Sequence, residues 1–324
     1  MAQHSGAVTA ARTRRWAGGL LTLVVLAGTA LTGCGLVGGQ STASSVGIQA
    51  SRGPTPTSGV SPSPSPACPP APAKFSCVMR ARIAAVQQYL RRRPGVVGVV
   101  LRDRTTGALW QNPQARTPVY MASTSKLAMA TTLLLENQSG AIHLSPADMA
   151  TMHQMLHVSS DQDADALWFK FGAPFYTSMF PKIGLAHARY LAQAGVTGPY
   201  WGEMMCPATD LSRLITYVLT KLPPPLRAYF ENTLRHVAAD QHFGVWGAGP
   251  AEQPGNKDGW SLEKPGWIIN TVGFAGPGAR YTLAVMNSLN GHGGYHDGTD
   301  TVTQVAALLF RGHQVPAPRV SATP

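Results

Sequence analysis

The sequence predicts an α+β fold in which one antiparallel sheet is flanked by helices and packs beside an all-helical lobe. Segments with the composition of β-strands occur early, at residues 96–110, and late, at residues 267–286. The stretch between them carries apolar residues at helical spacing. Strands at both ends of a domain, with helices between them, fit a sheet that is assembled from both ends and covered by the middle of the chain.

The first 33 residues have the features of a secretory signal. A positive segment comes first, formed by Arg12, Arg14 and Arg15. An uncharged apolar run over residues 16–31 and small residues before Cys34 follow it. A cysteine directly after the cleavage site resembles the bacterial lipobox, so we expect residues 1–33 to be removed and Cys34 to carry an acyl lipid such as palmitate. The alternative is an uncleaved membrane helix, but the run is short for the roughly 20 apolar residues of a span.

Residues 34–73 are predicted to form a lipidated N-terminus and a disordered linker. They contain mainly Gly, Ser, Thr, Pro and Ala, so they bury too little apolar surface to offset chain entropy. The Ser-Pro repeat at residues 61–66 is typical of an extended spacer. The folded domain is expected at residues 74–315, with a disordered tail at 316–324. A lipid and a spacer together predict a domain held at the extracytoplasmic face of the cell membrane.

The chain is basic, with a net charge of +11, and the leader holds three arginines and no acid, which leaves +8 for the remainder. Positive charge outside a cell suggests anionic wall polymers, lipid headgroups or carboxylate substrates as partners. Nucleic acid is not expected, because the basic residues are scattered and the protein is exported. If Cys34 is lipidated, Cys68, Cys77 and Cys206 remain. The sequence leaves open a Cys68–Cys77 bridge, a Cys77–Cys206 bridge and no bridge, and one disulfide is favoured.

The first part of the domain is predicted to contain a helix and a hairpin. The helix covers residues 78–93 and ends at Pro94-Gly95. A β-branched run at residues 96–101 and a returning segment at 109–110 then form a hairpin around the turn at 104–107.

Helices follow in the middle and strands near the end. Helices are expected from Ser123 to near Gly140, after a capping Ser145, and over residues 208–218. Strands at residues 267–269 and 281–286 should pair around a Gly-Pro-Gly turn, and a closing helix is expected at about 301–310.

Ser123 and Lys126 form the first part of a candidate active site. They lie near the start of a predicted helix, where positions i and i+3 share a face. A lysine beside a serine can activate a hydroxyl that is a weak nucleophile at its own pKa. Two further polar segments follow in order, Ser159-Ser160-Asp161-Gln162 and Lys257-Asp258-Gly259-Trp260.

The order S-x-x-K, S-D-N and K-T-G is the signature of class A β-lactamases and penicillin-binding proteins, and this chain resembles that serine hydrolase family from about residue 96 to 310. It is most similar to the lipid-anchored, β-lactamase-like exported proteins of high-GC Gram-positive bacteria, in which Trp-Gly before a helix start, here Trp201-Gly202, and a K-x-G-W strand are familiar. The resemblance implies a β-lactamase/transpeptidase-like fold and acyl-enzyme chemistry.

The resemblance also implies a role for each motif residue. Ser123 would be the nucleophile, with its backbone N–H as an oxyanion donor, and Lys126 would be the proton acceptor. Ser160 would relay a proton to the leaving group. Lys257 would lower the pKa of that serine and attract a substrate carboxylate. The positions implied for substrate binding are Gln162, Asp258 and Gly259.

Three departures from the family pattern argue against efficient β-lactam hydrolysis. Gln162 stands where Asn is usual, and Asp258 stands where a hydroxyl residue is usual, so an anion would repel a substrate carboxylate or pair with Lys257. Between residues 170 and 205 the only acid is Glu203, which lies too close to the following helix to match the deacylating glutamate.

The expected function is a membrane-anchored serine hydrolase that acts on a cell-wall peptide, a β-lactam or another ester or amide. The alternative is an inactive β-lactamase-like lipoprotein that binds the cell wall or a partner. No cofactor and no metal is expected. His153 and His157 have the i, i+4 spacing of a zinc motif, but Gln154 stands where the acid is needed and no third ligand is evident, so they are interpreted as buried or capping histidines.

Overall fold

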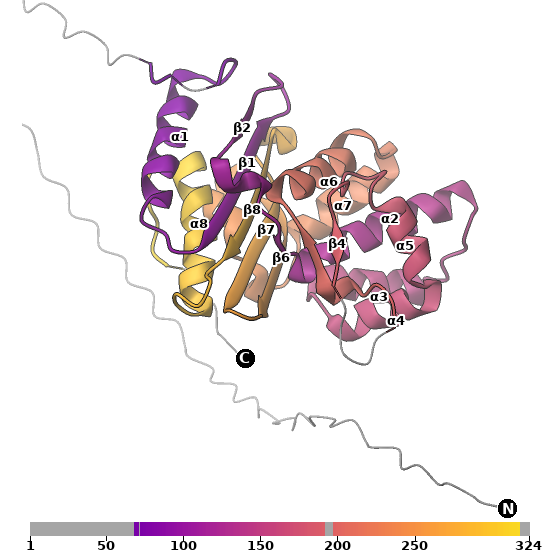
Figure 1. The fold of residues 1–324 in the computed structure, drawn as a ribbon. Helices are drawn as coiled ribbons and strands as arrows, with labels where there is room; N and C mark the ends of the chain where they lie inside the picture. Colours follow the sequence, from indigo (N-terminus) through magenta and orange to yellow (C-terminus); the bar gives the residue numbers. More distant parts are fainter. Residues whose placement is uncertain (1–67, 71, 192–196, 318–324) are drawn as a thin grey trace, which may run out of the picture. The chain divides into compact units, whose positions relative to one another are not determined.

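The computed structural model describes residues 68–70, 72–191 and 197–317 (Figure 1). The predicted signal, Cys34, most of the predicted linker and the end of the tail lie outside these residues. Among the described helices, none is both long and apolar enough to cross a membrane.

A five-stranded antiparallel sheet forms the centre of the domain (Figure 1). Its order is β2-β1-β8-β7-β6, and its strands are β1 (Val96–Asp103), β2 (Leu109–Gln111), β6 (Gly255–Leu262), β7 (Trp267–Ala275) and β8 (Tyr281–Ser288). β1 pairs with β8 along its whole length, from Val96 opposite Ser288 to Asp103 opposite Tyr281. The prediction that strands from both ends of the domain form one sheet is therefore confirmed.

Two terminal helices cover one face of this sheet. α1 (Cys77–Leu90) and α8 (Tyr295–Phe310) lie side by side there (Figure 1). The short 3₁₀ helix η5 (Gly244–Ala248) packs beside α8. α8 begins six residues earlier than predicted, because the Asp297 side chain accepts a hydrogen bond of 2.8 Å from the Gly294 N–H and so caps a helix start within the glycine-rich loop.

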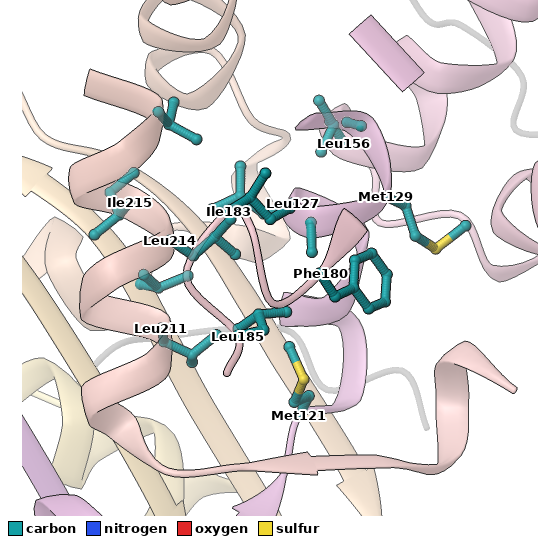
Figure 2. Packing of buried hydrophobic residues seen from close by; sticks show 14 of the residues in the cluster. Met121, Leu127, Met129, Leu156, Phe180, Ile183, Leu185, Leu211, Leu214 and Ile215 are labelled. Atoms are coloured by element: carbon teal, nitrogen blue, oxygen red, sulfur yellow. The ribbon is translucent and has the colours of Figure 1, made fainter. Parts of the chain in front are cut away.

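The other face carries the helical lobe. Its helices are α2 (Ser125–Ser139), α3 (Pro146–His157), α4 (Asp161–Phe171), α5 (Ala173–Met179), α6 (Ala208–Thr220) and α7 (Pro224–Arg235). Figure 2 shows α6 contributing Leu211, Leu214 and Ile215 to a core that α2 enters through Leu127 and Met129. α6 also contacts β1, β7 and β8. It therefore joins the lobe to the sheet through one continuous apolar core.

A second, three-stranded sheet of order β3-β5-β4 lies within the lobe. Its strands are β3 (Val119–Tyr120), β4 (Arg189–Tyr190) and β5 (Met204–Cys206). This sheet was not predicted, because strands of two or three residues show no alternation of apolar and polar positions.

The structure selects one of the two open cysteine pairings. Cys68 and Cys77 form a disulfide at the start of α1, and Cys68 lies within the segment predicted to be linker. Cys206 is a free thiol, fully buried in β5. Its Sγ lies 3.9 Å from the Met286 Sδ.

Candidate active site

Ser123 lies on a tight turn that leads into α2. The turn is the 3₁₀ helix η2 (Ala122–Thr124). Ala122, just before the serine, has a φ of +47°, a left-handed conformation that is uncommon for a residue with a β-carbon. The Lys126 Nζ donates a hydrogen bond of 2.9 Å to the Ser123 Oγ, so the structure contains the contact that the S-x-x-K spacing predicts. Ser123 is 9% exposed and Lys126 is fully buried.

The serine that joins the two lysines is Ser159, whereas the sequence analysis assigned this position to Ser160. The Ser159 Oγ accepts a hydrogen bond of 2.7 Å from the Lys257 Nζ and lies 3.5 Å from the Lys126 Nζ. The Ser160 Oγ instead accepts from the Asp163 N–H at 3.2 Å and caps α4. A side chain committed to a helix cap points along its own helix, so Ser160 does not reach the lysines.

Lys126 is surrounded by acceptors from the segment that precedes α4. Its Nζ donates to the Ser159 carbonyl oxygen at 2.6 Å and to the Asp161 Oδ1 at 2.5 Å. The ring of Trp201 lies under the same ammonium, with 4.7 Å between Nζ and the ring centroid. Burial lowers the pKa of Lys126, and the charge and hydrogen bond of Asp161 oppose that shift. Asp161 therefore favours the protonated lysine.

Lys257 enters the site from β6 and is fully buried. Its Nζ donates to the Ser159 Oγ, to the Gln241 Oε1 at 3.2 Å and to the Asp258 carbonyl oxygen at 2.8 Å. Burial, and then repulsion by the Lys126 charge, lowers the pKa of Lys257 to about 7. The two lysines therefore share an environment in which one proton is easily lost near neutral pH.

Asp258 does not lie where the sequence analysis placed it. Successive side chains of a strand point to opposite faces, so Asp258 points away from the face that carries Lys257. It is fully buried, and neither carboxyl oxygen has a hydrogen-bond partner within the described residues. Burial raises the pKa of the Asp258 carboxyl well above its usual value, and the charge of Lys257 opposes that shift without cancelling it. Asp258 is therefore a buried acid beneath the site and not a wall that faces substrate.

Gly259 allows β6 to pass directly over the nucleophile turn. A β-carbon at this position would lie 2.8 Å from the Met121 carbonyl oxygen and from the Thr124 nitrogen, and 2.9 Å from the Ser123 nitrogen. Gly259 pairs with Asn270 of β7, and the Asn270 Nδ2 donates to the carbonyl oxygens of Tyr120 and Met121 at 2.8 and 3.1 Å. The sheet and the turn are thus fixed to each other beside Ser123.

The predicted substrate-binding Gln162 is solvent-exposed, and Glu203, the acid that does not match the deacylating glutamate, is partly buried. Gln162 is exposed on the first turn of α4, and the polar side chain that contacts Lys126 belongs to Asp161. Glu203 is half-buried, and burial followed by repulsion from Glu263 raises its pKa.

The two histidines with zinc-like spacing are not both buried, contrary to their interpretation. His153 is exposed, and its ring stacks on that of His157 with 5.4 Å between centroids. The His157 Nδ1 lies 2.6 Å from the His236 carbonyl oxygen. Within the described part of the chain, no group of three or more His, Cys, Asp or Glu side chains could hold a metal ion.

No protein-family model matches the chain. A search of curated proteins finds "Putative lipoprotein LppW" of Mycobacterium tuberculosis and of Mycobacterium bovis, each 28% identical over 227 residues, which are 66% of this chain and 69% of the relative. The name of these relatives gives no activity.

The solved structures most relevant to the fold are β-lactamases and PBP-A. A β-lactamase from Xanthomonas campestris has a TM-score of 0.60 at 17% identity and is matched over 72% of this chain and 98% of its own. PBP-A gives 0.59 at 16% identity, over 75% of this chain and 97% of its own. The chain therefore has the fold of class A β-lactamases and PBP-A, and the predicted resemblance and α+β fold class are confirmed.

Proposed function

We propose that this chain is an exported lipoprotein whose β-lactamase-like domain is a serine hydrolase that forms an acyl-enzyme at Ser123. The observation that carries the proposal is the buried chain of contacts from Ser123 through Lys126 and Ser159 to Lys257. It joins three distant segments and contains a nucleophile, a candidate base and a proton relay. The same chemistry would suit a cell-wall peptide, a β-lactam or another ester or amide.

The geometry supports the following sequence of steps. Once the pair of lysines has lost one proton and the remaining proton lies on Lys257, neutral Lys126 takes the proton of Ser123 as the Ser123 Oγ attacks the substrate carbonyl carbon. The Ser123 N–H donates to the oxygen that becomes negative. The C–O bond forms, and the bond to the leaving group then breaks. Ser159 passes a proton to that group and is resupplied by Lys257. Water then attacks the carbonyl carbon of the ester and gives a proton through Ser159 to Lys257. Lys126 returns its proton to the Ser123 Oγ as the bond between that oxygen and the carbonyl carbon breaks.

Backbone strain next to Ser123 and at Ser159 supports a functional role. Ala122 has a φ of +47° and Ser159 has a φ of +57°. Each such residue costs about 1–3 kcal/mol, and strain of this kind gathers at active sites because it positions reacting groups. A serine that only capped a helix would gain nothing from it.

Intact-mass spectrometry with a penicillin and with a fluorophosphonate tests this proposal. Wild-type protein should gain the mass of one probe, and Ser123→Ala should gain none. Ser125→Ala is the matched control, because Ser125 lies two residues away and its Oγ donates to the Ala122 carbonyl oxygen at 2.9 Å, away from the lysines. This variant should be labelled like the wild type. Unmodified wild-type protein with both probes would contradict the proposal.

A second candidate function is a non-catalytic lipoprotein that binds the cell wall or a partner. It is favoured by Asp161, which contacts Lys126 and opposes its deprotonation. For this function, wild-type protein would gain no probe, and peptidoglycan capture would be equal for wild type and Ser123→Ala. If the folded wild-type protein gains neither probe but still binds peptidoglycan, the first proposal is wrong and this one replaces it.

The membrane anchor is proposed at Cys34, which follows the predicted signal of residues 1–33 and lies outside the described residues. The lipoprotein name of the LppW relatives supports it. Cys34→Ala should lose metabolic labelling by an alkynyl palmitate analogue, because the acylated thioether is then absent. Cys206→Ala is the control, since that thiol is buried and should not be acylated. Labelling that persists in Cys34→Ala would exclude this anchor.

A further inference from the structure

A basic groove of about 800 Å³ lies at the sheet edge opposite the candidate active site. Lys257 lies on β6, whereas this groove begins at β2, the other edge strand. Its lining includes Leu109, Gln111, Arg116, His187, Arg189 and Arg213. These side chains come from β2, the turn before β3, β4 with the turn that precedes it, and the start of α6. The groove shares no residue with the Ser123 site.

Positive charge dominates the groove. Arg116, Arg189 and Arg213 are exposed, and none of the described residues that line the groove is acidic. Within the described part of the chain, Arg116 and Arg189 make no side-chain hydrogen bond and no ion pair. Among the described residues, the donors of these two guanidinium groups are therefore free to bind a ligand in the groove. Three apolar side chains lie beside them, Leu109, Pro118 and Pro207. They limit the access of water and so strengthen the electrostatic attraction between the guanidinium groups and an anion.

A buried carboxylate fixes the other two basic side chains. Asp210 is fully buried below the groove. It accepts hydrogen bonds from the Arg213 Nη2 at 2.7 Å and from the His187 backbone N–H at 2.6 Å. The His187 Nδ1 also lies 3.0 Å from this carboxylate. Asp210 neutralises the charge of Arg213 and holds the side chains of Arg213 and His187 at the rim. The groove is therefore pre-organised and keeps the positive charges of Arg116 and Arg189.

We propose that this groove binds a phosphate group. Guanidinium forks pair with oxyanions through two parallel hydrogen bonds. A phosphate presents more acceptor oxygens than a carboxylate does, so it can engage guanidiniums that arrive from β4 and from the turn before β3 at the same time. The side chains of Thr209 and His187 at the rim add a hydroxyl and an imidazole. The phosphate belongs either to a soluble phosphate compound or to a lipid headgroup, and the chemistry of recognition is the same.

The test measures binding of inorganic pyrophosphate to the detergent-solubilised full chain by calorimetry at constant ionic strength. The groove variant is Arg116→Gln/Arg189→Gln. The matched control is Arg91→Gln/Arg92→Gln, which removes the same charge from two exposed arginines after α1. Each lost charge-assisted contact is worth about tenfold in affinity. The groove variant should therefore bind at least about tenfold more weakly, while the control binds like the wild type.

Further arms separate the outcomes. Full chains with Cys34→Ala and each pair of substitutions are sedimented with phosphatidylglycerol vesicles and with neutral vesicles. Binding of anionic vesicles that only the groove variant loses identifies a lipid headgroup, and pyrophosphate binding without it identifies a soluble phosphate. The proposal is overturned by no binding to either probe, by an equal loss in both variants, or by acetate binding as tightly as pyrophosphate. None of these readouts depends on Ser123.

Discussion

Lys257→Met should slow covalent labelling of Ser123 by about a hundredfold or more, which is the usual contribution of a positioned proton-transfer group. Lys257 donates 2.7 Å to the Ser159 Oγ, and Ser159 lies between Lys257 and Lys126. A methionine side chain has a similar length, but its thioether has no proton to donate. Ser159 would then have no group from which to regain the proton that it passes to the leaving group. The second-order rate constant for labelling by penicillin or fluorophosphonate measures the effect.

The same substitution should change the pH dependence of labelling. In the wild type, the Lys126 charge and burial lower the pKa of Lys257 to about 7, so the pair of lysines loses a proton as the pH rises through about 7. Labelling needs one neutral amine and should increase through that pH. In Lys257→Met the amine with a pKa of about 7 is gone, and Asp161 favours the protonated form of the remaining Lys126, so the increase in labelling moves to higher pH.

Lys221→Met is the control for a lost lysine charge, because Lys221 is exposed at the end of α6. It should label at the wild-type rate with the wild-type pH profile. A Lys257→Met protein that is folded and labels normally would show that the contact with Ser159 has no part in the chemistry. A slower rate without a shift in the pH profile would place Lys257 in a structural role.

Much of the fold could be predicted because its signals are local. The β-branched run at β1, the turn before β2 and the capping Ser145 each carry their own pattern. The order of the motifs then identified Ser123 and Lys126 and the K-x-G strand. Local patterns could not predict the small sheet of β3, β4 and β5, because its strands are too short to show alternation of apolar and polar residues.

The serine that contacts the two lysines is Ser159 and not the predicted Ser160, for a physical reason that the sequence contains. Ser160 is followed three positions later by Asp163, the spacing of a helix start, and its hydroxyl is used as the cap. A cap at Ser160 leaves the Ser159 hydroxyl free to contact the lysines, and Asp161 lies beside Lys126. The orientation of Asp258 has the same kind of cause, because adjacent residues of one strand point to opposite faces and Asp258 directly follows Lys257 on β6.

Gly259→Ala should destabilise the domain by about 1–3 kcal/mol, the usual cost of overpacking, and should also abolish or strongly slow labelling of Ser123. The added methyl would meet the backbone of Met121, Ser123 and Thr124 at 2.8–2.9 Å. No side-chain rotation can relieve such contacts, so β6 must separate from the nucleophile turn. That movement displaces the Ser123 N–H, the proposed oxyanion donor, from its position. Denaturant unfolding and mass spectrometry measure the two effects on the same samples.

Gly294→Ala is the matched control for this substitution. Gly294 precedes α8, has a φ of −112° and would place a β-carbon no closer than 3.9 Å to the atoms around it. Its alanine variant should lose less than about 1 kcal/mol, as expected at a helix cap, and should label normally. If Gly259→Ala behaved in the same way, the turn and the strand would tolerate separation, and the oxyanion donor would have to lie elsewhere. If stability fell in Gly259→Ala while labelling stayed intact, the contact would hold the fold together without positioning Ser123. The proposed site requires both effects, because one backbone contact joins the sheet to the nucleophile.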